Sequence, residues 1–101
     1  MYVKMYKLEE TLITVTYKFE VHVAIPLPLE KRVPHGPRNY LETRYGVMTM
    51  NKETKEYELD SAQTHPYFER DGYEVRLTRA KLWRILKDNE EFPEETDIAT
   101  G

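Results

Sequence analysis

Three histidines, His22, His35 and His65, are the side chains in this sequence best suited to bind a divalent metal ion. Glu20 lies two residues before His22 and would share its face of an extended strand. The spacing between these residues matches no recognised metal-binding motif, and two of the histidines adjoin a proline in a loop-like stretch. We therefore expect histidines without a metal ligand role, and no cofactor.

The residues that support nucleophilic catalysis are nearly absent. The sequence contains no cysteine, and Ser61 is its only serine. It also lacks a glycine-rich phosphate loop, a G-x-S-x-G elbow and an H-E-x-x-H pair. Carboxylates such as Glu42, Asp60 and Glu69 are explained by ordinary solvated charges. The prediction is a protein that is not an enzyme.

Tyrosine and cationic side chains gather in one stretch and suggest binding. Both tyrosine and arginine are enriched at binding hot spots, because each offers a large contact area with a polar end. The same types can also stack on single-stranded bases and contact phosphates. In the simplest alternative the tyrosines pack at a sheet edge and the arginines are solvated. The predicted partner-binding residues are Lys31, Arg32, His35, Arg38, Tyr40, Arg44 and Tyr45.

A second basic group is expected on one face of a helix near the C-terminus: Arg79, Lys81, Arg84 and Lys87. Such a face usually only solubilises a helix, but it could bind phosphates. Residues 90–101 follow with five acidic and no basic residues. A tethered acidic segment would compete with any polyanion for this face, which weakens the nucleic-acid hypothesis.

Composition narrows the class of protein. The 101 residues carry a net charge of −3, which fits neither a nucleic-acid mimic nor a strongly basic nucleic-acid binder. The N-terminus has no apolar signal-peptide core, no stretch is long enough to span a membrane, and absent cysteine fits a reducing cytoplasm. We expect a cytoplasmic module that occludes a surface on a protein partner, as phage or mobile-element inhibitors of host machinery do. Single-stranded nucleic-acid binding is the alternative function.

One stretch of near-perfect alternation must position these residues. Apolar side chains occupy every odd position from Ile13 to Ile25, and mostly polar side chains fill the even positions. Because successive side chains of a strand point to opposite faces, this run predicts a long antiparallel strand with one buried face. A strand of this length outruns its neighbours, so a homodimer through an uncovered edge is also expected.

The remaining pattern predicts an α+β fold. Four or five antiparallel strands would form a sheet, with one C-terminal helix on its apolar face; a small barrel of the OB or SH3-like kind is the alternative. Strands are expected over residues 2–8, 40–50 (with a bulge or bend at Gly46) and 56–59, with a proline-rich loop over 26–37.

Local signals place the last elements. Asp71-Gly72 predicts a type I′ hairpin turn, and Thr78 is expected to cap a helix over residues 79–89. One domain over residues 1–89 and a flexible acidic tail over 90–101 complete the prediction. The expected core comprises Val15, Tyr17, Phe19, Val21, Val23, Leu82, Trp83 and Leu86.

Overall fold

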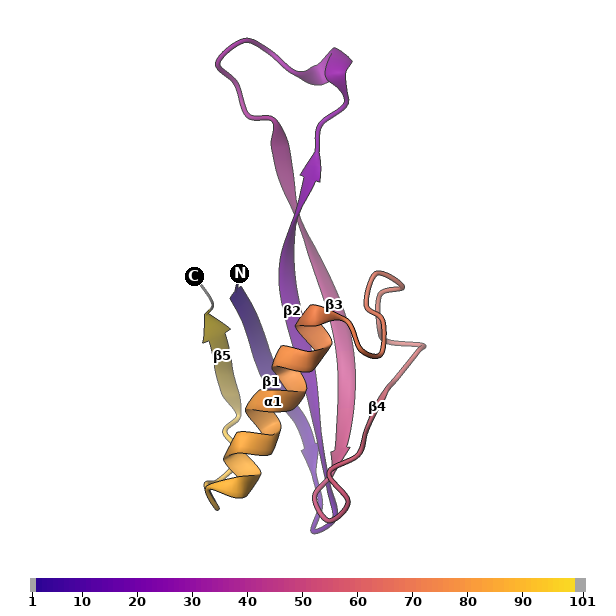
Figure 1. The fold of residues 1–101 in the computed structure, drawn as a ribbon, viewed down its shortest axis with the longest axis vertical. Helices are drawn as coiled ribbons and strands as arrows, with labels where there is room; N and C mark the ends of the chain where they lie inside the picture. Colours follow the sequence, from indigo (N-terminus) through magenta and orange to yellow (C-terminus); the bar gives the residue numbers. More distant parts are fainter. Residues whose placement is uncertain (1, 100–101) are drawn as a thin grey trace.

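The computed structural model describes residues 2–99, which form one open antiparallel sheet with a helix across one of its faces (Figure 1). Every neighbouring pair of strands is antiparallel, in the order β4-β3-β2-β1-β5. The predicted α+β class is confirmed, and the sheet is open rather than closed into a small barrel. The elements are β1 (Tyr2–Glu10), β2 (Thr14–Pro26), the 3-10 turn η1 (Leu29–Lys31), β3 (Asn39–Asn51), β4 (Tyr57–Leu59), α1 (Tyr73–Lys87) and β5 (Glu95–Ala99).

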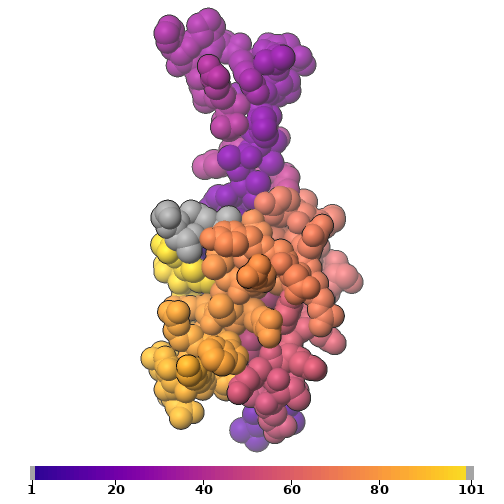
Figure 2. All heavy atoms as spheres, viewed as in Figure 1, coloured from indigo at the N-terminus to yellow at the C-terminus, as the bar shows by residue number. Residues whose placement is uncertain are grey.

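The β2–β3 hairpin is longer than the rest of the sheet. Its ladder runs from Thr14–Asn51 to Pro26–Asn39, whereas the β1–β2 ladder begins at Val3–Val21. Residues 22–43 therefore leave the body as a two-stranded ribbon, which we call the arm (Figures 1 and 2). The molecule measures 54 × 27 × 20 Å as a result. Side chains of β2 are buried only as far as β1 runs beside it: Val21 is buried, but Val23 and Ile25 are only half-buried.

The core lies between the helix and the odd-numbered face of β2. Val15, Tyr17, Phe19 and Val21 are buried there, as predicted, and Leu82 packs on them with Leu86 at the margin. Methionines from β1 and β3 complete this layer: Met5, Met48 and Met50.

The predicted core position of Trp83 and the predicted bulge at Gly46 are both wrong. Trp83 lies outside it, with 39% of its surface exposed, because Leu82 and Ile85 take the inward positions of the helix. Gly46 makes no bulge, since the β2–β3 register is continuous across it. Gly46 instead leaves room for the Phe19 ring, which packs directly over it: a Cβ on Gly46 would lie 2.2 Å from Phe19 Cζ. The bulge is in β1, between Lys7 and Glu9.

The helix begins six residues earlier than predicted. Asp71-Gly72 does not form a hairpin turn, because Gly72 has φ −66° and is the N-cap of α1. Thr78 lies inside the helix, where its Oγ1 donates to the carbonyl oxygen of Glu74 at 2.9 Å. Val75 and Thr78 are both buried, about two turns and one turn before Leu82. Burial of this extended stripe outweighs the local turn preference of the Asp-Gly pair.

The acidic C-terminal segment contains a strand rather than only a tail. Residues of β5 pair with β1 from Tyr2–Ala99 to Tyr6–Glu95, so the predicted tail without secondary structure is wrong over this stretch. Ile98 packs against the core, while the acidic side chains face solvent. Lys4 Nζ lies 3.4 Å from Glu95 Oε1, so β1 supplies a countercharge for the acidic strand.

Candidate interaction surfaces

Four of the predicted partner-binding residues gather at the tip of the arm: Lys31, Arg32, His35 and Arg38. The loop that carries them is closed by its own hydrogen bonds. The Leu27 amide donates to the Arg38 carbonyl oxygen at 2.8 Å, which extends the β2–β3 ladder by one step. Arg32 Nε donates to the Leu27 carbonyl oxygen at 2.9 Å, so this arginine braces the loop. Lys31, His35 and Arg38 are exposed.

A tight turn shapes the far side of the loop. The Gly36 amide donates to the Val33 carbonyl oxygen at 3.0 Å, and Pro34 and His35 occupy the two central positions. His35 has φ 64°, the left-handed backbone that the third position of a type II turn requires. Glycine or asparagine usually fills that position, so His35 adopts a conformation that is unfavourable for its type. The turn holds the imidazole at the end of the molecule.

The tip loop also carries apolar side chains, which could either form an exposed binding surface or cover one end of the core. In the second case, the loop leucines and Val33 would be buried against that end. Leu29 is 78% exposed and Val33 62% exposed, so neither covers it; only Leu27 is half-buried. Exposed apolar residues beside cations are the composition of a protein-binding patch. We call Leu29, Lys31, Val33, His35 and Arg38 the tip patch.

The other predicted partner-binding residues do not join the tip patch. Tyr40 lies on the stem of the arm, half exposed, while Arg44 and Tyr45 belong to the body. Arg44 Nη2 contacts Glu42 Oε2 at 2.7 Å, and its guanidinium lies 4.7 Å from the centre of the Tyr67 ring. Tyr45 pairs with Glu20 on the opposite face of the sheet. The predicted tyrosine–arginine cluster is therefore divided between two faces.

Basic residues of α1 lie beside two aromatic rings, of which Trp83 is exposed and Tyr57 is buried. Lys87 Nζ lies 5.1 Å from the centre of the Trp83 ring, and the Arg79 guanidinium lies 5.3 Å from that of Tyr57. Arg84 is exposed and Lys81 half-buried. A shallow depression of about 380 Å³ follows the helix, lined by Tyr73, Arg76, Leu77, Arg79, Ala80 and Trp83. Sequence reasoning missed Tyr73 and Arg76 because it began the helix too late.

The three histidines lie on separate segments. His22 is in β2, where its Nδ1 is 3.0 Å from Thr43 Oγ1 and its Nε2 is 3.7 Å from Glu20 Oε1. His35 is at the tip, and the His65 Nδ1 accepts from the Tyr67 amide at 2.9 Å. Within residues 2–99, no three histidine or carboxylate side chains are grouped so that they could hold a metal ion.

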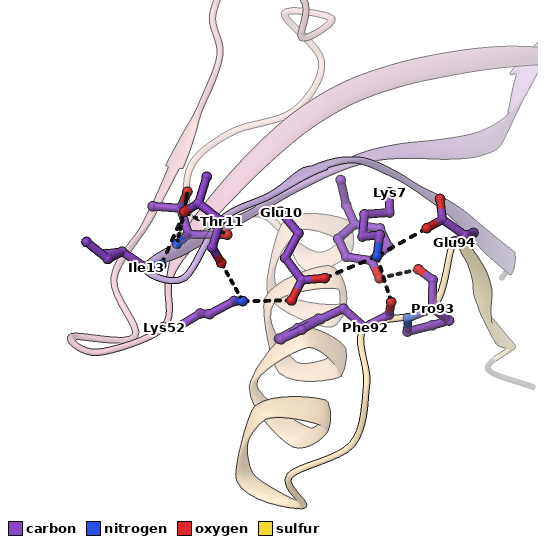
Figure 3. Close-up of polar contacts among 10 residues, drawn as sticks. Lys7, Glu10, Thr11, Ile13, Lys52, Phe92, Pro93 and Glu94 are labelled. Carbon is purple, nitrogen blue, oxygen red and sulfur yellow. Dashed lines mark hydrogen bonds and ion pairs between the residues drawn. The ribbon is translucent and has the colours of Figure 1, made fainter.

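A polar cluster closes the end of the body opposite the arm (Figure 3). Lys7 Nζ contacts Glu10 Oε1 at 3.1 Å and the Phe92 carbonyl oxygen at 3.1 Å, and Lys52 Nζ contacts Glu10 Oε2 at 2.7 Å. The hydrogen bond from Lys52 is the main reason that the pKa of Glu10 is lowered. Each lysine already contacts a carboxylate, so this cluster ties β1, the turn after β3 and the segment after α1 together.

Tyr17 lies behind this cluster, and its hydroxyl donates to the Pro93 carbonyl oxygen. Burial raises the pKa of its phenol to about 12, so the hydroxyl remains a hydrogen-bond donor throughout the physiological range.

Comparison with protein-family models, with curated proteins and with solved structures gave no match to this chain. Among the described residues, no helix has the length and apolar character needed to cross a membrane. The geometry of the surfaces is therefore the basis for assigning a function.

Proposed function

We propose that this chain is a non-enzymatic binding module that occludes a surface on a protein partner, and that the arm carries the tip patch into that surface. The observation that supports this most is the combination of reach and exposure. The patch sits at the end of a ribbon that projects from the body (Figure 2), and Leu29 and Val33 are largely in solvent there.

The order within the tip loop supports the same proposal. Its ends are joined by the Leu27–Arg38 hydrogen bond, Arg32 braces its interior, and four prolines restrict its backbone over residues 26–37. A loop that is already ordered loses little conformational entropy on docking. The exposed side chains of the tip patch include the cations Lys31 and Arg38, with Glu30 beside them as the one acidic residue of the loop, so the complementary partner surface is an apolar hollow with carboxylates at its rim. An inhibitor of host machinery, of the kind that phages and mobile elements encode, fits this mode of action.

Single-stranded nucleic-acid binding has weaker support. The tyrosines and arginines that suggested it are divided between two faces, and Arg44 is already paired with Glu42. On the sheet face that carries Tyr45, Lys18 lies 4.3 Å from its ring centre, but Glu20 adjoins it. A carboxylate among the stacking residues repels phosphates.

Affinity capture with matched variants tests the proposal. Leu29→Asp with Val33→Asp places two charges on the tip patch, and Leu12→Asp is the control because Leu12 is 96% exposed at the other end of the molecule. We expect the unmodified chain and the control to recover one stoichiometric protein from a lysate of the source cells, and the tip variant to lose it.

Circular dichroism should show that all three proteins are folded, since none of the replaced side chains is buried. Retention of the partner by the folded tip variant would contradict the proposed surface. Recovery that disappears on nuclease treatment would favour nucleic acid instead.

A further inference from the structure

The outer edge of β3 in the arm has free backbone groups. In an antiparallel ladder, the N–H and C=O groups of successive residues point alternately to the two sides of the strand. Because Leu27 bonds to Arg38, even-numbered residues of β3 point toward β2. Odd-numbered residues point away from β2. The carbonyl oxygens of Tyr45 and Val47 show this, because they accept hydrogen bonds on that outer side from the amides of His65 and Asp60.

Alternation leaves Asn39, Leu41 and Thr43 with both backbone groups directed away from β2. Among the described residues nothing pairs with this stretch, because β4 meets β3 only at Met48–Met50. The opposite edge of the arm is protected differently: Ala24 and Pro26 point outward from β2, and Pro26 has no N–H to offer. The β3 edge has neither a proline nor a lysine between Asn39 and Thr43. Exposed edges of this kind pair with another strand.

We propose that the β3 edges of two copies of this chain pair antiparallel about a two-fold axis at Tyr40, so that the protein is a homodimer joined through its arms. In this register Tyr40 faces Tyr40 of the second copy, and Asn39 faces Leu41. Those facing residues are both outward-directed, so the two Asn39–Leu41 pairs form four interchain hydrogen bonds. The 72% exposed Leu41 and the half-exposed Tyr40 lie at the centre of the contact.

Charge favours this register over the two that are shifted toward the body. Outward-directed residues of one copy must face outward-directed residues of the other. The alternative registers are therefore those in which the two-fold axis moves along β3 by whole residues. Pairing about Tyr40 places Arg38 opposite Glu42 of the second copy, and does so twice. Glu42 uses only its Oε2 to contact Arg44, so its Oε1 is available. Pairing about Leu41 would instead place Arg38 opposite Arg44, and pairing about Glu42 would place two carboxylates together.

The surface beside the edge accommodates the second arm. The ladder would end where Pro37 faces Thr43, because proline has no N–H. From there the second chain turns through Gly36 and His35. A surface depression of about 330 Å³ lies at this place, between residues 43–45 and residues 62–65. The tip patches of the two copies then lie at opposite ends of the paired arms; Arg38 and His35 take part in the dimer contact, and Leu29, Lys31 and Val33 are left for a partner.

Disulfide trapping tests both the dimer and its register, because the chain contains no cysteine. Tyr40→Cys should cross-link rapidly under mild oxidation, since Cα atoms in a non-hydrogen-bonded pair are about 4.5 Å apart, within the range that a disulfide needs. Leu41→Cys should not cross-link, because its own counterpart is offset along the ladder. Leu12→Cys, exposed at the far end of the body, measures random collision.

Light scattering on the unlinked chain completes the test. We expect twice the 12.1 kDa mass of one chain at micromolar concentration, and the monomer mass for Leu41→Pro. Proline at position 41 removes an outward-directed N–H but no hydrogen bond to β2. Leu41→Ala keeps this N–H, so that variant should remain a dimer. The tip variant should remain dimeric, which separates this proposal from the proposed function. A monomer at all concentrations, or faster trapping of Leu41→Cys than of Tyr40→Cys, would overturn it.

Discussion

Replacing Gly46 with alanine tests how tightly the core closes around Phe19. Gly46 does not have positive φ, so alanine can adopt its backbone conformation. On backbone grounds alone the substitution should stabilise the fold by about 0.4–1 kcal/mol, because alanine has fewer unfolded conformations to lose. Any destabilisation must therefore come from contact of the new methyl group with its surroundings.

The structure shows that this contact is severe. The added Cβ would lie 2.2 Å from Phe19 Cζ and 2.7 Å from its Cε1, against an optimal carbon–carbon separation of about 3.5–4.0 Å. The ring must retreat by more than about 1 Å, but Phe68 packs edge-on against it with centroids 5.0 Å apart. Overpacking of this kind costs about 1–3 kcal/mol, so we expect a net loss of about 1–2 kcal/mol.

Urea unfolding followed by far-UV circular dichroism measures this loss. The same substitution is then made in a Phe19→Leu background, where the shorter side chain leaves room for the methyl group. There Gly46→Ala should be neutral or stabilising, so the two changes should be non-additive by about 1–3 kcal/mol. A Gly46→Ala protein more stable than the parent, or an equal cost in both backgrounds, would refute the packing described for Phe19.

Two further predictions concern single side chains. The pKa of Tyr17 is raised to about 12 in the folded chain against 10.0 ordinarily, so the stability linked to its protonated phenol is complete below pH 10 and lost between pH 10 and 12. Urea unfolding at pH 9 and pH 12 should show a smaller alkaline loss for Tyr17→Phe than for the parent; equal losses would contradict the assignment. His35→Gly should leave the tip turn intact because glycine favours positive φ, whereas β-branched His35→Val should disrupt it. Hydrogen exchange of the Gly36 amide should accelerate only in the valine variant.

The sheet was predictable because its signal is local. Alternation from Ile13 to Ile25 depends only on the two-residue period of a strand, and it identifies the buried face of β2 as far as Val21. It could not show where burial stops, because that depends on where β1 begins. Val23 and Ile25 continue the pattern as part of the arm, where no third strand accompanies them.

The errors near the C-terminus have a tertiary cause. Asp71-Gly72 is as compatible with the start of a helix as with a hairpin turn, and burial of Val75 and Thr78 decides between them. The acidic composition of residues 95–99 favoured a prediction of a flexible tail. The countercharge that supports β5, Lys4, lies about ninety residues away in the sequence. No single-sequence pattern carries that information.

The candidate site was predictable in part, where its residues are close in the sequence. Lys31, His35 and Arg38 belong to one short loop, so proximity in sequence ensured proximity in space. Arg44 and Tyr45 are adjacent in sequence but lie on opposite faces of β3. The two-residue period of a strand already implies this separation, because neighbouring side chains in residues 40–50 must alternate between the faces just as those of β2 do.

Register connects the core to the arm. The β2–β3 ladder is continuous from the body to the tip, so the packing of Phe19 over Gly46 also fixes which residues of the arm face outward. A slip of one residue that kept Phe19 in the core would turn Met48 and Met50 to the open face of the sheet, and it would direct the backbone of Tyr40 and Glu42 outward in place of Asn39 and Leu41. The core therefore determines the edge that the arm presents, and substitutions at Gly46 and Leu41, far apart along β3, probe the same alignment.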